Sequence, residues 1–357
     1  MCKIEKIIFF ASVVALFITS CNKAPVNQTI SDFATEEQTV INDFVNNVAL
    51  GQYSNLTNAA VSLNGSIITL NSSITETNLN SARTAWRNIR NTWEQSEGFL
   101  FGPVEDNDYD PNTDTWPTDY TQIDSLLSSS NPLEVSDIAD LPQSLRGYHP
   151  LEYVIFGHGE GRSATELTPR LLKYALNLSA DILYNNVQPL YQSWSSAPTN
   201  YAQEVLTAGN GSTKFGKRQD LFLAINGAMS DICEEVGEGK MLEPFIAKDS
   251  GITESPYSNN TLSDFKNNII GVRNVYLGLN GGAGLKDLVA LKNKSLDNQI
   301  QSQLNAAISS FDNITVSYEQ AIYDQRTLVQ QTITQINTLK ELLDEDLHDF
   351  ILTNVKD

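Results

Sequence analysis

One of the three histidines in this 357-residue chain stands in a segment that could bind a metal ion. The segment "RGYHPLEYVIFG" (146–157) places His149 and Glu152 three positions apart. Side chains three residues apart share one face of a helix, so both groups could hold the same ligand. An imidazole nitrogen and a carboxylate suit iron, zinc or copper, but they make only half of a site. We predict His149 and Glu152 as metal ligands, with the other ligands supplied from elsewhere in the chain.

The same spacing also has a purely structural interpretation. Pro150 suits the first position of a helix, which makes His149 the residue just before it. Glu152 then falls at the third helical position, where a carboxylate can accept a hydrogen bond from the capping residue. A scaffolding protein in which the motif only caps a helix therefore stays open as an alternative.

The segment does not match a conventional zinc peptidase. In the HExxH motif a glutamate follows the first histidine directly, and the second histidine stands four positions after the first. Pro150 and Tyr153 occupy these two positions here. The chain also contains no nucleophile elbow, phosphate loop or dinucleotide fingerprint. Enzyme activity stays open, and we favour a binding protein over a metallopeptidase.

The N-terminus predicts export and lipid attachment. Residues 1–21, "MCKIEKIIFFASVVALFITSC", combine a basic start with an apolar run that is too short for a stable membrane anchor. The last four residues resemble a bacterial lipobox. We predict a lipoprotein signal peptide at 1–20 and a lipidated N-terminus and tether at 21–34, with the lipid on Cys21. An ordinary signal peptide is the alternative. The expected location is the cell envelope, on the periplasmic or outer surface of a bacterial membrane.

The charge balance excludes one class of partner. The full chain carries a net charge of −20, and removing residues 1–20 would change it to −21. A strongly acidic surface repels nucleic acid and anionic lipid headgroups, so neither is an expected partner. The remaining expectations are a metal ion or small ligand and the membrane reached through the lipid. Cys233, the single cysteine expected beyond Cys21, cannot form an internal disulfide bond.

Apolar residues recur at helical spacing along the chain, and no segment alternates as a strand does. The clearest helical segments are 40–48, 79–98, 168–195, 216–236, 261–279 and 295–352. Residues 103–120 break the pattern and predict a long loop. The fold class is therefore all-α. We predict an N-terminal helical bundle at 35–165, which carries the His149 segment, and a C-terminal helical bundle at 166–357.

Several blocks of sequence resemble the imelysin family. The residues from Gly147 to Glu152 match its GxHxxE motif. Further matching blocks, in chain order, are "ARTAWRNIRNTWEQSEGFLFGP", "WPTDYTQID", "EEVGEGKMLEP" and "ESPYSNNTLSDFKNNIIGVRNVYLG". Together they extend over most of residues 35–350. The resemblance implies two helical bundles with the motif near their interface, an extracytoplasmic location and an association with iron uptake. Peptidase activity is the runner-up, because the family takes its name from a protease.

Oxygen donors in one of these blocks could complete the site. Glu254, Ser255 and Ser258 precede a helix that is expected to begin near Thr261, and they could either join His149 or cap that helix. We add four residues as candidate ligand-binding positions: Gly147, Arg83, Trp116 and Arg273. Each arginine lies on an apolar stripe and is expected to pair with a carboxylate, to orient Glu152 or to bind an anionic ligand. The expected cofactor is a divalent or ferric metal ion, either iron or zinc.

Overall fold

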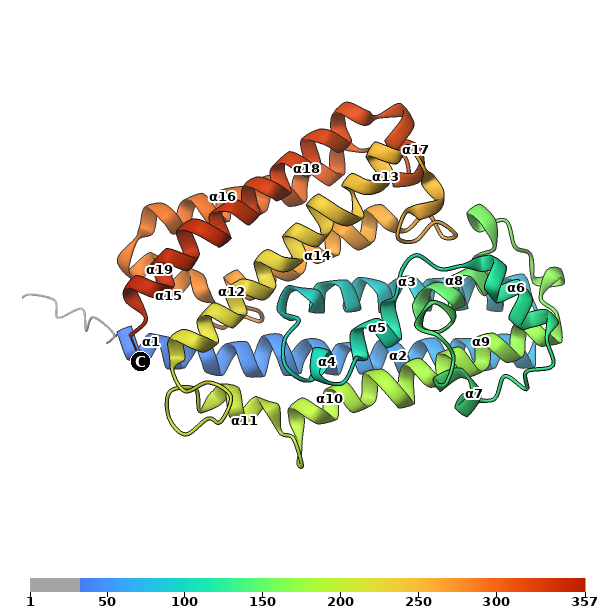
Figure 1. Cartoon of the computed structure of the whole chain (residues 1–357), viewed down its shortest axis with the longest axis horizontal. Coiled ribbons are helices and arrows are strands. Elements are labelled where there is room, and N and C mark those ends of the chain that lie inside the picture. Colours follow the sequence, from blue (N-terminus) through green and yellow to red (C-terminus); the bar gives the residue numbers. More distant parts are fainter. Residues whose placement is uncertain (1–32, 357) are drawn as a thin grey trace, which may run out of the picture.

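The computed structural model describes residues 33–356, which form helices and connecting segments without any strand (Figure 1). This confirms the predicted all-α class. Cys21 and the predicted signal peptide lie outside the described residues. Residues 33 and 34 were predicted as the end of the tether, but they already belong to the first helix. Within residues 33–356, no helix has both the length and the apolar character needed to cross a bilayer.

Two long helical segments form the lower part of the molecule in Figure 1. The first joins α1 (Phe33–Asp43) to α2 (Leu50–Ser72) through a π-helical turn at 44–49. The second joins α9 (Pro169–Asp181) to α10 (Gln188–Ser195) through a similar turn at 182–187. Both α9 and α10 pack against α2, and α3 (Glu76–Ser96) packs against α2 as well.

The upper part contains the helices from α12 onwards. These are α12 (Arg218–Glu234), α13 (Leu242–Ala247), α14 (Thr261–Leu277), α15 (Leu285–Lys292), α16 (Lys294–Ser310), α17 (Tyr318–Asp324), α18 (Arg326–Glu341) and α19 (His348–Asn354). Helix α18 packs against α12 and α16, and α14 packs against α3. The contact between α14 and α3 joins segments that are far apart in the sequence, and the candidate site lies beside it.

Short helices fill the region between α3 and α9. They are α4 (Pro103–Asp106), α5 (Tyr109–Asp114), α6 (Tyr120–Ser128), α7 (Val135–Ala139) and α8 (Tyr148–Phe156), and α11 (Tyr201–Leu206) follows later. The prediction of a continuous loop at 103–120 is therefore wrong, because α4 and α5 lie within it. The division into bundles at residues 165 and 166 stays a prediction. Helices on its two sides pack together, since α9 contacts both α2 and α8.

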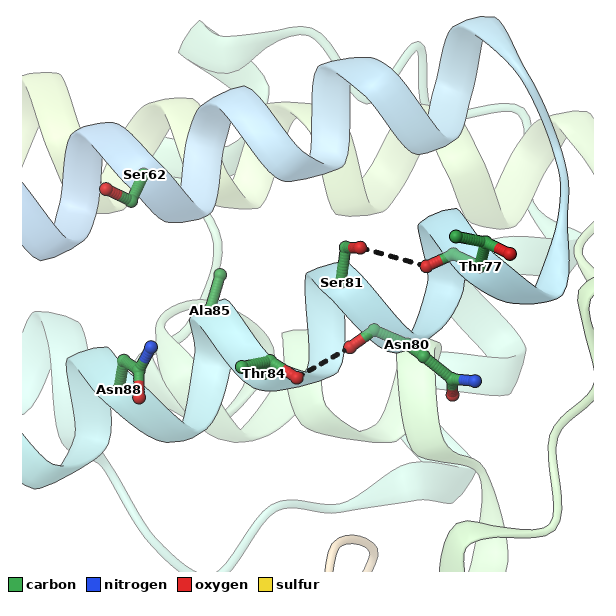
Figure 2. A pocket seen from close by; sticks show the side chains of 7 residues that line it. All are labelled: Ser62, Thr77, Asn80, Ser81, Thr84, Ala85 and Asn88. Atoms are coloured by element: carbon green, nitrogen blue, oxygen red, sulfur yellow. Dashed lines mark hydrogen bonds between the residues drawn. The ribbon is translucent and has the colours of Figure 1, made fainter.

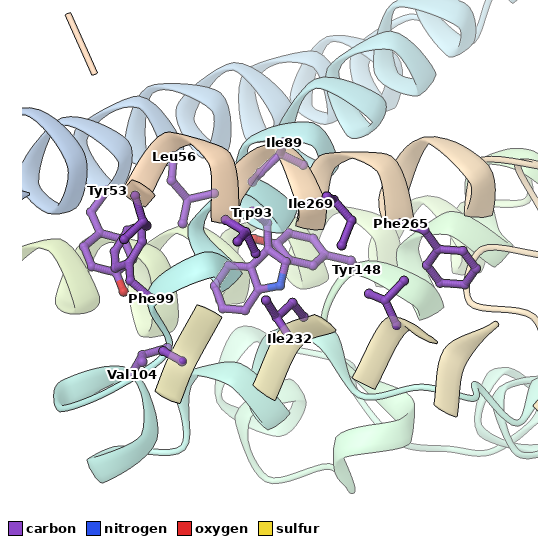
Figure 3. Close-up of a cluster of buried hydrophobic side chains, with 14 of the residues drawn as sticks. Tyr53, Leu56, Ile89, Trp93, Phe99, Val104, Tyr148, Ile232, Phe265 and Ile269 are labelled. Atoms are coloured by element: carbon purple, nitrogen blue, oxygen red, sulfur yellow. The ribbon is translucent and has the colours of Figure 1, made fainter. Parts of the chain in front are cut away.

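Two glycines allow α14 to approach the end of α3 closely. A Cβ atom on Gly98 would lie 2.6 Å from the carbonyl carbon of Gly271, and one on Gly271 would lie 2.6 Å from the backbone oxygen of Gln95. Aromatic side chains pack next to this contact, including Trp93 and Tyr148, whose ring centres are 5.7 Å apart (Figure 3). The close contact brings the polar side chains of α3 and α14 into one buried region.

Candidate metal centre

The first residue of the GxHxxE motif acts through its backbone. Gly147 precedes α8 with φ 89° and ψ −155°, a conformation that favours glycine. A Cβ atom at this position would lie 2.2 Å from the backbone oxygen of Thr113, near the end of α5. The missing side chain therefore lets the start of α8 contact the end of α5. This contact brings His149 to Asp114, the residue after Thr113.

The imidazole of His149 lies between two carboxylates and is 1% exposed. Its Nδ1 atom is 3.3 Å from Oε2 of Glu152, and its Nε2 atom is 3.1 Å from Oδ1 of Asp114. Burial alone would lower the pKa of His149. The contacts with Asp114 and Glu152 outweigh burial and raise this pKa from 6.5 to about 9. The two carboxylates therefore favour the protonated form of the ring.

Glu152 joins α8 to the segment 253–260, which we call the 253–260 loop. Its Oε1 atom accepts hydrogen bonds from the backbone N–H of Tyr257 at 3.0 Å and of Ser258 at 2.7 Å. The hydroxyl of Ser258 donates a third bond to the same oxygen at 2.7 Å. The alternative interpretation, in which Glu152 caps its own helix, is therefore wrong, because Oε1 binds backbone groups 105 and 106 residues away and Oε2 contacts the ring of His149.

Arg90 of α3 is the central cation of the site and is fully buried. Its guanidinium donates to Glu94 and Asp114, lies 3.2 Å from Glu254, and lies 3.6 Å from Asp264 through Nε. Burial works against the charge on Arg90, but these carboxylates raise its pKa well above the usual value. The side chain therefore provides a permanent positive charge among four acidic groups.

The buried acidic side chains form what we call the acid cluster. Its six members are Glu94, Glu97, Asp114, Glu152, Glu254 and Asp264, and each side chain is at most 3% exposed. Neutral donors contribute to it: Trp93 donates to Glu97 and Asp114 at 2.7 Å, and Asn268 donates to Glu94 and Glu97 at 2.6 Å.

Cations do not balance the acid cluster. Besides Arg90, it contacts Lys240, whose Nζ atom is 3.0 Å from Glu254, and His149. Burial raises the pKa of Glu94 well above its usual value, although Arg90 opposes this shift. Burial likewise raises the pKa of Asp264 from 3.8 to about 7. Burial therefore disfavours the ionised forms of these two carboxyl groups, which lie in a cluster with fewer cations than carboxylates.

Two buried atoms at one edge of the acid cluster are poorly satisfied. Nε2 of His149 faces Oδ1 of Asp114 at 3.1 Å without a well-directed hydrogen bond, and Oε2 of Glu254 has no hydrogen-bond partner. Asp114, His149 and Glu254 each offer a ligand atom, and these three atoms lie within 4.8 Å of one another. Two other groups of three residues among residues 33–356 also bring their ligand atoms within 4.8 Å of one another, but they contain carboxylates alone, whereas this triad includes a histidine nitrogen. A nitrogen and two carboxylate oxygens are donors that iron and zinc accept.

The two serines predicted as helpers have different partners. Ser255 donates from its hydroxyl to Asp264 at 2.6 Å, whereas Ser258 binds Glu152 as described. Both side chains are buried and both orient carboxylates of the acid cluster. Trp116 lies at the edge of this region, and its indole nitrogen donates to the backbone oxygen of Thr253 at 2.7 Å. It therefore holds the start of the 253–260 loop, one residue before Glu254.

The two predicted arginines lie outside the acid cluster. Arg83 donates to the backbone oxygens of Ile155 and Arg162, so it binds the C-terminal end of α8 and not a carboxylate. Arg273 is half-buried on α14 and has no ion pair within the described part of the chain. The expectation that each arginine would pair with a carboxylate is wrong. Arg90, two helical turns after Arg83, occupies the position that was expected of Arg83.

A surface hollow lies away from the triad. It has a volume of about 610 Å³ and lies between α2 and α3 (Figure 2). Several of its hydroxyl groups donate within their own helix, since Ser81 binds the backbone oxygen of Thr77 and Thr84 binds that of Asn80. None of the triad residues lines it. The triad is closed to solvent in this conformation.

Comparison with known proteins identifies relatives across most of the chain. The family model for imelysin matches residues 49–345. Iron-regulated protein A from Synechococcus elongatus is 30% identical over 187 residues, which make up 52% of this chain and 49% of that protein. The alignment thus spans about half the length of this curated relative.

Two solved structures share the fold. An iron-regulated protein A precursor from Parabacteroides distasonis is 26% identical, with a TM-score of 0.79 over 90% of this chain and 95% of that one. An imelysin-like protein from Psychrobacter arcticum is 12% identical, with a TM-score of 0.73 over 91% of this chain and 98% of that one. The likeness to the second protein concerns the fold alone.

Proposed function

The chain belongs to the imelysin family, and from this premise we propose that it binds a metal ion, foremost iron, through Asp114, His149 and Glu254. The proposal keeps His149 as the predicted ligand and replaces the predicted partner Glu152 with two carboxylates from other elements. Relatives named iron-regulated proteins support iron as the first metal to test.

The observation that carries this proposal is the buried triad, whose three ligand atoms lie within 4.8 Å of one another. A buried polar atom without a partner costs free energy, on the order of 1–3 kcal/mol. Glu254 Oε2 is one such atom, and His149 Nε2 faces Asp114 at 3.1 Å without a well-directed hydrogen bond. A metal ion bound by the triad would give these atoms a partner and add positive charge to the acid cluster.

The charge of the acid cluster favours a highly charged ion. With all six carboxyl groups ionised and His149 neutral, Arg90 and Lys240 leave an excess of four negative charges. A divalent ion halves this excess, whereas a trivalent ion reduces it to one. Oxygen-rich ligand sets also suit hard cations. We therefore propose ferric iron ahead of zinc.

Metal content and titration test this function directly. Protein purified without chelators is expected to contain iron, and the metal-free protein is expected to bind iron and zinc at about one ion per chain. Asp114→Asn, His149→Gln and Glu254→Gln should each abolish or strongly weaken binding. Asp297→Asn is the matched control, because Asp297 is a buried carboxylate of α16 outside the acid cluster. Equal affinity in the wild type and the three triad variants would contradict the proposal.

We further propose that the protein acts at the cell envelope, attached through a lipid on Cys21. The basis is the lipobox-like end of residues 1–21. In cells fed a palmitate analogue that can be tagged, the wild-type protein should become labelled and Cys21→Ser should not. If both proteins become labelled, the lipid is attached to a residue other than Cys21. If neither becomes labelled, the proposed lipid anchor is contradicted.

Peptidase activity is the second candidate, and the peptidase designation of the family model favours it. The geometry opposes it, because the side chains of the triad are at most 2% exposed and a polypeptide cannot reach them. We expect no cleavage of unfolded protein substrates by the iron- or zinc-loaded protein. Chelator-sensitive cleavage that is lost in His149→Gln would reverse this order of preference.

A further inference from the structure

We propose that Glu152 is the positioning residue of the metal site and not one of its ligands. This inference rests on the proposed metal binding by Asp114, His149 and Glu254. It assigns a separate physical role to each named residue of the motif. Gly147 permits the contact with α5, His149 binds the ion, and Glu152 aligns two ligands that come from different elements.

The hydrogen bonds of Glu152 occupy both lone pairs of Oε1 and one of the two on Oε2, so most of this carboxylate is already engaged. A carboxylate offers about four acceptor positions. Oε1 receives three bonds from the 253–260 loop, two from backbone N–H groups and one from the hydroxyl of Ser258. Oε2 is engaged by Nδ1 of His149. Glu152 is also absent from every group of closely spaced ligand atoms found among residues 33–356.

One oxygen of Glu152 selects the tautomer of His149. Because a carboxylate without a proton can only accept, the Nδ1 atom that faces it must carry a hydrogen. When the ring is neutral, the lone pair is then on Nε2, which faces Asp114 of the triad at 3.1 Å. Carboxylates commonly orient metal-binding histidines in this way.

The other oxygen of Glu152 fixes the loop that carries Glu254. This oxygen accepts hydrogen bonds from Tyr257 and Ser258, which follow the proposed ligand Glu254 by three and four residues. Two more hydrogen bonds support the same loop. The indole N–H of Trp116 donates to the backbone oxygen of Thr253, and the backbone N–H of Glu160 donates to the backbone oxygen of Tyr257 at 2.9 Å. A single carboxylate therefore sets the relative positions of His149 on α8 and Glu254 on the loop.

Glu152→Gln tests the assignment because glutamine is nearly the same shape. Its amide oxygen can still accept the loop bonds, but its NH₂ group then faces Nδ1 of His149 as a donor. The neutral ring must carry its hydrogen on Nε2, which blocks the ligand atom. We expect the variant to fold and to bind Zn²⁺ about 10- to 100-fold more weakly than the wild type. Ser258→Ala is the control: it removes one loop bond and leaves the Nδ1 contact, so a smaller loss is expected.

Two spectroscopic measurements distinguish a positioning residue from a metal ligand. Nitrogen NMR of zinc-loaded wild-type protein should show His149 bound through Nε2 and protonated at Nδ1. This measurement needs no variant. X-ray absorption at saturating Zn²⁺ should give the same number of protein ligands in the wild type and in Glu152→Gln.

The outcomes distinguish this inference from the proposed function. If the wild-type protein binds neither zinc nor iron, the proposed function fails and this inference fails with it. If the wild type binds metal but Glu152→Gln loses one coordinating oxygen, Glu152 is a ligand and only the positioning role is overturned. Metal bound through Nδ1, or unchanged affinity in Glu152→Gln, likewise overturns the positioning role alone.

Discussion

Replacing Gly147 with alanine should weaken metal binding although residue 147 supplies no ligand. The added Cβ atom would lie 2.2 Å from the backbone oxygen of Thr113, whereas ordinary contact begins near 3.4 Å. The start of α8 or the end of α5 must therefore shift by about 1 Å. A shift of this size exceeds the roughly 0.5 Å within which a metal site must hold its ligands.

The magnitude follows from two separate costs. Placing alanine at φ 89° and ψ −155° costs about 1–3 kcal/mol of folding free energy through backbone strain. The displacement also separates His149 on α8 from Asp114 on α5. We expect a loss in metal affinity of about 10- to 100-fold, similar to the loss of other supports around metal ligands.

Gly211→Ala is the matched control for the Gly147 variant. Gly211 also has a positive φ, 99°, but a Cβ atom there meets nothing within 4 Å. Both variants should lower the midpoint of urea unfolding, while only Gly147→Ala should lower the affinity for iron and zinc measured by calorimetry. If Gly147→Ala binds metal as tightly as the wild type, the close contact does not position His149, and the reasoning fails.

Three further outcomes follow from the acid cluster and its surroundings. Arg90→Met should destabilise the chelated protein by about 3–5 kcal/mol in urea unfolding, because it leaves buried carboxylates without their cation. Added metal should restore part of this stability. An unchanged free energy of unfolding would exclude the central role of Arg90. The melting temperature of the chelated protein should fall as the pH rises from 5 to 9. Folding raises the pKa of Asp264 from 3.8 to about 7 and that of His149 from 6.5 to about 9, so the stability that each group contributes is complete below its unfolded pKa and is lost as pH rises through its folded pKa. A melting temperature that rises over this range would contradict the prediction. Gly98→Ala should cost about 1–3 kcal/mol in the same urea assay by forcing α3 away from Gly271, and a neutral effect would show that the helices can adjust.

Local patterns in the sequence were sufficient to predict the positions of the main helices, but they were not sufficient to predict which residues make up the proposed ligand set. Apolar spacing predicted the segments at 168–195, 216–236 and 261–279, which correspond to α9 with α10, to α12 and to α14. The same rules gave His149 and Glu152 as neighbours because three residues along a helix form a local geometry. Asp114 is different. It lies in a segment predicted as a loop, and only the close contact at Gly147 brings it to His149.

Arg83 and Arg90 show what the apolar periodicity of a helix cannot predict. They are seven residues apart on one helix, so they share a face and lie about 10 Å apart along the axis. Apolar periodicity assigns both to the buried stripe and cannot tell which one lies level with the acidic residues. That choice depends on where α14 and the 253–260 loop cross α3. The crossing is set by the Gly98–Gly271 contact, which links residues more than 170 positions apart.

The acid cluster is difficult to explain as a purely structural feature. Buried ion pairs contribute little net stability, and apolar side chains of similar volume often do as well or better. A cluster selected for stability alone would balance its charges and satisfy its polar atoms. This cluster has more carboxylates than cations and leaves Glu254 Oε2 without a hydrogen-bond partner. Arg90 and Lys240 offset part of this negative charge, and the excess that remains supports the proposed role of the triad as a cation site.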